Sequence, residues 1–243
     1  MEETRRREKI KACIAISVIV LAILITGIIS MKYYVEGETN MPFTLSKIII
    51  VNQVDTVNKS GENTTSCIIQ NNNIYFAIEK NENNKENEII ESFSIENIQV
   101  IENPKIGTIK TYMPNSSEGR LFSYSDEYIV QENKLTYKGA SKSNSKTLEI
   151  GNQGGNIAIS IVNTNIGEYT LKTNEINENL LSKVNVELEE ITFKVAFDVV
   201  IKLKNTSYTT NVILDLPSRK GLIEEGISSQ EITDRFVFKR VIN

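Results

Sequence analysis

The chain of 243 residues carries 27 lysines and arginines against 31 aspartates and glutamates, a formal net charge of −4. It has no histidine, which excludes catalysis or metal binding through an imidazole, and no tryptophan, a residue enriched in binding hot spots. Beyond residue 31 the chain carries 22 basic and 28 acidic side chains, a balance unsuited to nucleic acids, which need a basic face. Frequent isoleucine and asparagine with scarce alanine are typical of bacterial sequences of low GC content.

Residues 12–31 form an uncharged, largely apolar run of 20 residues. A helix of this length measures about 30 Å, the thickness of the hydrocarbon core of a bilayer. The run therefore predicts an uncleaved transmembrane signal-anchor helix, with the lipid bilayer as its partner. A cleaved signal peptide is the alternative, but its apolar core is shorter, and Ile28–Lys32 lacks an A-x-A-like cleavage site.

The residues that flank this run predict its orientation. Segments rich in lysine and arginine stay cytoplasmic, so we expect residues 1–11 inside the cell and everything after Met31 outside the cytoplasm. Two tyrosines that follow the run are expected at the level of the lipid headgroups. This topology prediction is carried by Arg5, Arg6, Arg7, Lys9, Lys11, Tyr33 and Tyr34.

A juxtamembrane linker is expected over residues 32–45, and residues 46–243 consist mostly of short segments with the alternation or β-branching typical of strands. We expect a turn at Asn71–Asn73, and a phase change of the apolar residues predicts a β-bulge near Glu96–Asn97. The strands predicted in this half are Lys47–Val54, Ile74–Glu79, Ile89–Ile101, Ile106–Met113, Arg120–Tyr124, Lys134–Lys138, Thr147–Ile150 and Asn156–Val162. Asn81–Glu88 and Gly139–Lys146 are expected to be solvated loops.

The clearest strand is Ile191–Leu203, in which apolar and polar residues alternate over the whole segment. A short polar connection leads to a second alternating run, Tyr208–Leu216, so the two are predicted to form an antiparallel hairpin. Only Glu175–Lys183 has a helical pattern, and Phe236 and Phe238 mark a final strand.

These elements predict a mainly β chain: one transmembrane helix followed by an antiparallel β-sandwich of the immunoglobulin-like class, without that class's Cys…Trp…Cys pattern. A weak similarity of strand order between Ile74–Pro114 and Ile157–Pro217 leaves open a division into two lobes, with a boundary near 115–119.

Three motifs with catalytic or ligand-binding precedent have simpler interpretations. Cys67 has no histidine to activate it and is expected to pack as a small apolar residue. Ser143 and Lys146 have the spacing of a serine–lysine catalytic pair, but they lie in a segment rich in serine and lysine that is expected to be a loop. Gly151–Gly155 precedes a predicted strand rather than a helix, so it is expected to be a turn and not a phosphate cradle.

Acidic pairs are the remaining candidates for metal binding. Asp126–Glu127, Glu189–Glu190 and Glu224–Glu225 are each adjacent in sequence, and adjacent residues on a strand point to opposite faces. No spacing matches a calcium loop, so the pairs are interpreted as solvated surface charge. We therefore expect no catalytic, cofactor-binding or metal-binding residue and no cofactor, although calcium binding by acidic loops is left open.

The predicted function is that of a single-pass protein of a bacterial cell envelope, not an enzyme, whose extracytoplasmic β domain binds another protein. A rigid β framework that presents loops and strand edges is suited to such recognition. Two alternatives are left open: a histidine-independent envelope enzyme or polysaccharide-processing accessory that uses carboxylates, and a structural stalk.

Overall fold

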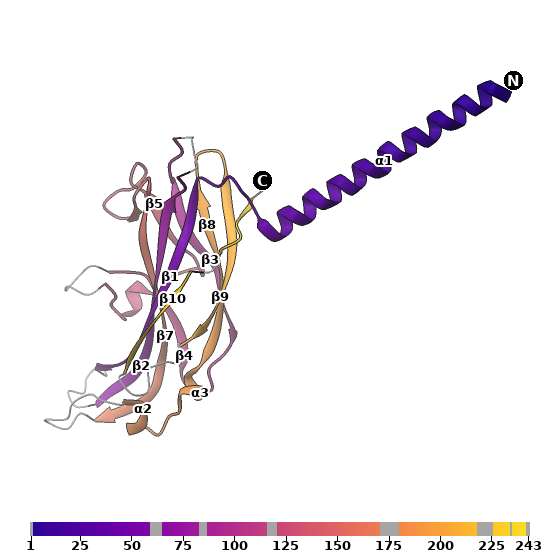
Figure 1. Cartoon of the computed structure of the whole chain (residues 1–243). Helices are drawn as coiled ribbons and strands as arrows, with labels where there is room; N and C mark the ends of the chain where they lie inside the picture. The colour runs from indigo at the N-terminus through magenta and orange to yellow at the C-terminus, as the bar shows by residue number, and fades with distance from the viewer. Residues whose placement is uncertain are drawn as a thin grey trace.

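The computed structural model consists of a long N-terminal helix and a body of two β-sheets (Figure 1). It describes residues 2–58, 65–82, 87–115, 121–170, 180–217, 226–233 and 235–241, and no side chain before Lys11 or at positions 12 and 13. The helix α1 spans Glu2–Glu36, so it begins before the predicted span and continues beyond Met31. Figure 1 shows α1 extending away from the sheets, with the C-terminal end of the chain close to the point where the helix joins them.

Sheet 1 has the strand order β10-β1-β2-β7-β4, and all its neighbours are antiparallel. Its strands are β1 (Phe43–Asn58), β2 (Thr65–Lys80), β4 (Thr108–Tyr112), β7 (Gly154–Thr170) and β10 (Ile227–Ile232). Three of them, β1, β2 and β7, are 16 or 17 residues long and form the centre of the sheet.

Sheet 2 has the order β11-β9-β8-β3-β5-β6, and its neighbours are antiparallel except β5 and β6, which are parallel. Its strands are β3 (Ser92–Glu102), β5 (Leu135–Gly139), β6 (Leu148–Ile150), β8 (Phe193–Lys202), β9 (Ser207–Leu216) and β11 (Lys239–Arg240). Three short helical segments complete the described elements: η2 (Asp126–Tyr128), α2 (Leu180–Lys183) and α3 (Leu188–Ile191).

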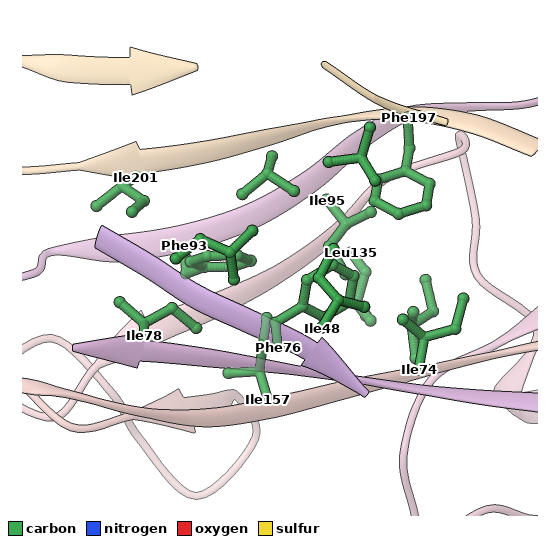
Figure 2. Packing of buried hydrophobic residues seen from close by; sticks show 14 of the residues in the cluster. Ile48, Ile74, Phe76, Ile78, Phe93, Ile95, Leu135, Ile157, Phe197 and Ile201 are labelled. Atoms are coloured by element: carbon green, nitrogen blue, oxygen red, sulfur yellow. The ribbon is translucent and has the colours of Figure 1, made fainter. Parts of the chain in front are cut away.

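The two sheets pack face to face around one main hydrophobic core. Phe76 of sheet 1 lies 5.8 Å from Phe197 and 6.1 Å from Phe93 of sheet 2, measured between ring centroids. Figure 2 shows these rings between the strands, together with isoleucines from both sheets. The core therefore confirms that apolar residues on alternate strand positions face inward.

The predicted hairpin of β8 and β9 is confirmed. The two strands pair from Phe193 with Leu216 to Lys202 with Ser207, and buried residues alternate with partly or fully exposed ones along both. The bulge in β3 is also confirmed, because the register with β8 shifts between Glu96 and Gln99 and Asn97 has a φ of 54°. Asparagine tolerates this left-handed conformation better than most residues.

The predicted turn at Asn71–Asn73 is wrong, because these residues lie in the middle of β2. Asn71 and Asn72 are almost completely buried, with 2% and 0% exposure. Pairing with β1 on one side and β7 on the other satisfies the backbone of this segment. Central position in the sheet therefore overrides the low strand propensity of asparagine.

The buried amides of sheet 1 form a polar layer inside the sandwich. Asn52, Gln70, Asn72 and Asn163 are each 0% exposed, and alternation along β1, β2 and β7 places them on the inner face. Gln70 Nε2 donates to Asn72 Oδ1 over 2.7 Å, and Asn72 Nδ2 donates in return to Gln70 Oε1 over 3.1 Å. Along each strand this layer separates the main core from a second hydrophobic cluster that includes Ile68.

Other differences concern segments without clear alternation. Leu121–Tyr124 is irregular and not a strand, although Phe122 is buried, and the final strand is Lys239–Arg240 rather than the Phe236–Phe238 segment. The strand β10 was not predicted from the sequence. Of the predicted helix, only Leu180–Lys183 lies within the described residues, and it is helical.

The strand pairing does not follow the two-lobe division near 115–119. Strands β2 and β3 precede this position in the chain, and they pair with β7 and β8, which follow it. Each sheet, and the main core between them, therefore combines residues from both sides of the predicted boundary.

Candidate functional site

The helix α1 presents an uncovered apolar surface. The segment Ile14–Glu36 is long and apolar enough to cross a membrane. Its most apolar part has a mean hydropathy of 2.8, and no residue of that part is buried. Isoleucines along the helix, such as Ile16 and Ile23, are 61% and 66% exposed. Exposed apolar area of this kind is costly in water and is stabilised by transfer into an apolar environment.

The residues predicted to set the topology lie at both ends of α1. The backbone of Arg5, Arg6, Arg7 and Lys9 is helical and their side chains lie outside the described part, whereas Lys11 is exposed. At the other end, Tyr33 is 39% and Tyr34 73% exposed. Both tyrosines contact the C-terminal segment of the chain, which the sequence did not indicate.

The C-terminal segment 235–241 connects the end of α1 to sheet 2, and we call it the clamp segment. The backbone N–H of Arg240 donates to the Tyr33 hydroxyl over 2.9 Å, and that of Glu38 donates to the Phe238 carbonyl over 2.8 Å. The Lys239 ammonium lies 4.1 Å from the centroid of the Tyr34 ring, a cation–π contact. The helix end is therefore held by residues about 200 positions further along the chain.

The close approach of the clamp segment requires a glycine at position 37. Gly37 has a φ of +70°, and a Cβ atom there would collide with the Phe238 carbonyl oxygen. In addition, the Arg240 guanidinium lies 3.6 Å from the Glu38 carboxylate. Hydrogen bonds, an ion pair and steric fit thus connect the end of α1 and the two residues that follow it to the clamp segment.

A groove of about 740 Å³ lies beside the part of β7 that β4 does not cover. Its apolar lining includes Tyr75, Met113, Pro114, Leu121 and Tyr128, and the other wall comes from residues 145–149. The loop predicted around Ser141–Lys146 therefore contributes to this groove through Ser145 and Lys146.

A buried tyrosine, Tyr137, and a half-buried one, Tyr124, lie in the surroundings of this groove. Tyr137 of β5 donates its hydroxyl hydrogen to the Ala158 carbonyl and accepts from the Ala158 N–H over 3.2 Å, so it caps the open edge of β7. Tyr124 packs edge to face on Tyr112 with ring centroids 5.4 Å apart. Burial raises the pKa of Tyr137, and burial raises the pKa of Tyr124 to about 12, so both phenols are neutral at physiological pH.

None of the motifs with catalytic precedent has a reactive arrangement in the contacts that the structure describes. Ser143 Oγ donates to the Ala140 carbonyl over 3.1 Å and also contacts the Glu149 carboxylate, while no described hydrogen bond joins it to Lys146. Cys67 is a partly buried free thiol on β2, opposite Val57 and Glu168. Gly151 precedes a turn at 152–153, and Gly154 begins β7.

The two acidic pairs within the described residues, Asp126–Glu127 and Glu189–Glu190, lie on short helical segments and not on strands, which corrects the geometry expected from sequence. Asp126 is in η2 and accepts from Lys110 Nζ over 3.0 Å. Glu190 forms a capping box with Glu187 at the start of α3. Glu224–Glu225 lies outside the described residues, and within the described part no group of three or more acidic or cysteine residues is positioned to hold a metal ion.

Comparisons with protein-family models, with curated proteins and with solved structures find no match to this chain. Its two most distinctive surfaces are therefore defined by geometry alone: the apolar helix with its clamp segment, and the groove beside β7.

Proposed function

We propose that this chain is a single-pass, membrane-anchored protein of a bacterial cell envelope whose outer β domain binds another protein. The observation that carries the anchoring is the exposed apolar surface of α1, which the sheets leave uncovered. A bilayer would remove this surface from water. The five basic residues before Ala12 support a cytoplasmic N-terminus and an extracytoplasmic β domain.

The strand order supports an immunoglobulin-like class for the β domain. In chain order, β1, β2, β3, β4, β7, β8 and β9 take the places of strands A to G: β1-β2-β7-β4 matches the order A-B-E-D, and β3-β8-β9 matches C-F-G. The remaining strands, β10 in sheet 1 and β11, β5 and β6 in sheet 2, extend the two sheets at their edges. Domains of this architecture commonly act as rigid platforms for recognition.

Protein binding is supported by the groove beside β7. Its lining of tyrosine, methionine, proline and leucine resembles the composition of interface cores, which are enriched in aromatic residues and methionine. Leu121 is 42% exposed at this groove, although it is a large apolar side chain. We propose that the groove receives an apolar side chain of a partner protein in the envelope.

The anchoring and its orientation are tested by protease treatment of intact cells stripped of their wall, which express the full chain with a tag at its C-terminus. We expect the C-terminal tag to be digested while an N-terminal tag is protected. A C-terminal tag that survives under conditions that digest a known outer domain would contradict the orientation.

Partner binding is tested by replacing Leu121 with the photoreactive p-benzoylphenylalanine in the full chain and irradiating intact cells. The matched control is the same replacement at Ile213, which is 58% exposed on the outer face of β9. We expect a discrete crosslinked protein from position 121 only. The same products from both positions, or products from position 213 alone, would contradict the proposed binding surface.

A further inference from the structure

A second groove, of about 620 Å³, lies where α1 meets the outer face of sheet 2. The last turn of α1 contributes Tyr34, β9 contributes Thr209 and Thr210, and the clamp segment contributes Arg235 and Lys239. The clamp segment therefore forms one wall of the groove, beside the end of the helix.

Two cations in this groove have no described carboxylate within ion-pair distance. The neighbouring cations are paired: Lys32 Nζ lies 3.8 Å from Glu36, and Arg240 pairs with Glu38. In contrast, the described contact of the Arg235 guanidinium is with the Glu36 carbonyl oxygen at 3.4 Å, and Lys239 lies over the Tyr34 ring. The charged lining of the groove consists of these two cations and the carboxylate of Asp198, so it is positive on balance, although the chain beyond residue 31 has 22 basic and 28 acidic side chains.

One acidic residue, Asp198, also lines the groove. Its Oδ2 accepts from Asn97 Nδ2 over 2.8 Å, and its Oδ1 accepts from Asn211 Nδ2 over 2.9 Å. Both oxygens of this carboxylate are thus occupied by amides, and the described contacts of the two groove cations are with Glu36 and Tyr34 instead.

The depth of the groove matches the headgroup layer of a bilayer that contains α1. Tyr34 is three residues beyond Met31, the last residue of the uncharged run. At about 1.5 Å per residue it lies about 4.5 Å past the hydrocarbon edge, and the headgroup layer extends about 5 to 8 Å on each side. A groove at this depth is in reach of lipid phosphates and not of acyl chains.

We propose that this groove binds the phosphate of an anionic membrane lipid, with Arg235 and Lys239 as its cationic ligands. The planar guanidinium of Arg235 is suited to bidentate contact with phosphate oxygens, and Lys239 supplies a point charge. The hydroxyl of Thr209 is a further donor on the wall of the groove. This site rests on the proposed anchoring by α1, and it would fix the tilt of the β domain on the membrane surface.

The test uses the full chain in nanodiscs of phosphatidylcholine with phosphatidylglycerol, followed by native mass spectrometry to count the lipids that stay bound. We expect wild type to retain phosphatidylglycerol in preference to phosphatidylcholine. The double variant Arg235→Gln with Lys239→Gln should lower this preference about thirty-fold, the effect of removing two cations near an anionic surface.

Two control variants separate the site from general charge and from folding. Lys105→Gln with Lys138→Gln also removes two exposed cations, but outside both grooves, and should leave the preference unchanged. Arg235→Lys with Lys239→Arg keeps both charges and should retain the lipid, which shows that loss in the glutamine variant does not come from misfolding of the clamp segment.

Each outcome decides the proposal. Equal retention by wild type and the glutamine variant overturns the headgroup site but leaves the anchoring intact, whereas a chain that fails to insert into nanodiscs overturns both. Free inorganic phosphate is added to a separate wild-type sample: displacement of the bound lipid would assign the site to soluble phosphate and overturn the lipid as its ligand.

Discussion

Replacing Phe197 with alanine is the most direct test of the packing between the two sheets. Phe197 is 1% exposed, and its ring packs edge to face on Phe76 at 77° and 5.8 Å (Figure 2). Removing a buried phenylalanine ring costs about 3 to 5 kcal/mol of the free energy of unfolding, because the transfer term and the cavity term add. The lost aromatic contact accounts for about 0.5 to 1.5 kcal/mol of this.

The effect is measured by urea unfolding of the full chain in detergent, followed by tyrosine fluorescence, since the chain has nine tyrosines and no tryptophan. The midpoint should fall while the slope stays constant. The control is Ile213→Ala, because Ile213 follows Val212, the cross-strand partner of Phe197, but points outward with 58% exposure. It should change the free energy of unfolding by less than about 0.5 kcal/mol. A Phe197→Ala loss below about 1 kcal/mol, or equal losses for both variants, would refute the inward orientation of this face.

Three further predictions address other parts of the structure. Asn72→Leu should lower the free energy of unfolding by about 1 to 3 kcal/mol in the same urea assay, because Gln70 loses its partner amide inside the sandwich; a neutral result would contradict the amide layer. Burial raises the pKa of Tyr137, so the unfolded chain releases this proton at a lower pH than the folded chain does. The free energy of unfolding should therefore fall as the pH rises above the ordinary tyrosine pKa of about 10. Tyr137→Phe should make this fall shallower in urea midpoints measured across the same pH range. Gly37→Ala should displace the clamp segment and speed limited proteolysis near the C-terminus, whereas Gly27→Ala, where a Cβ has open space, should not; equal rates would refute the close contact of Gly37.

The hairpin of β8 and β9 shows how much of the fold can be predicted from local pattern. A strand with one buried and one solvated face requires alternation, so the apolar positions of Phe193–Lys202 also identify the inner face. The bulge at Asn97 was predictable for the same reason, because an extra residue in a strand changes the phase of that alternation.

Asn71–Asn73 shows where local pattern fails. Three successive asparagines favour a turn in an isolated segment, yet here they pair with β1 and β7 over their whole length. Buried amides are stable only when other strands or side chains supply hydrogen-bond partners, as Gln70 and the Ile161 carbonyl do for Asn72. Gln70 lies two residues away on the same strand, but Ile161 lies on β7, 89 residues from Asn72, so no window of the sequence around Asn72 contains all of its partners.

The candidate sites likewise combine features that local sequence pattern predicts with features that depend on contacts between distant segments. The sequence by itself determined the apolar helix, its basic flank and the two-faced strands, because hydrophobic runs and alternation depend on neighbouring residues. Only the tertiary structure decided that Tyr33 meets Arg240, and that Arg235 and Lys239 share a groove with Tyr34. Contacts between residues about 200 positions apart depend on how the sheets close around their core, a property of the whole packed chain that no local pattern encodes.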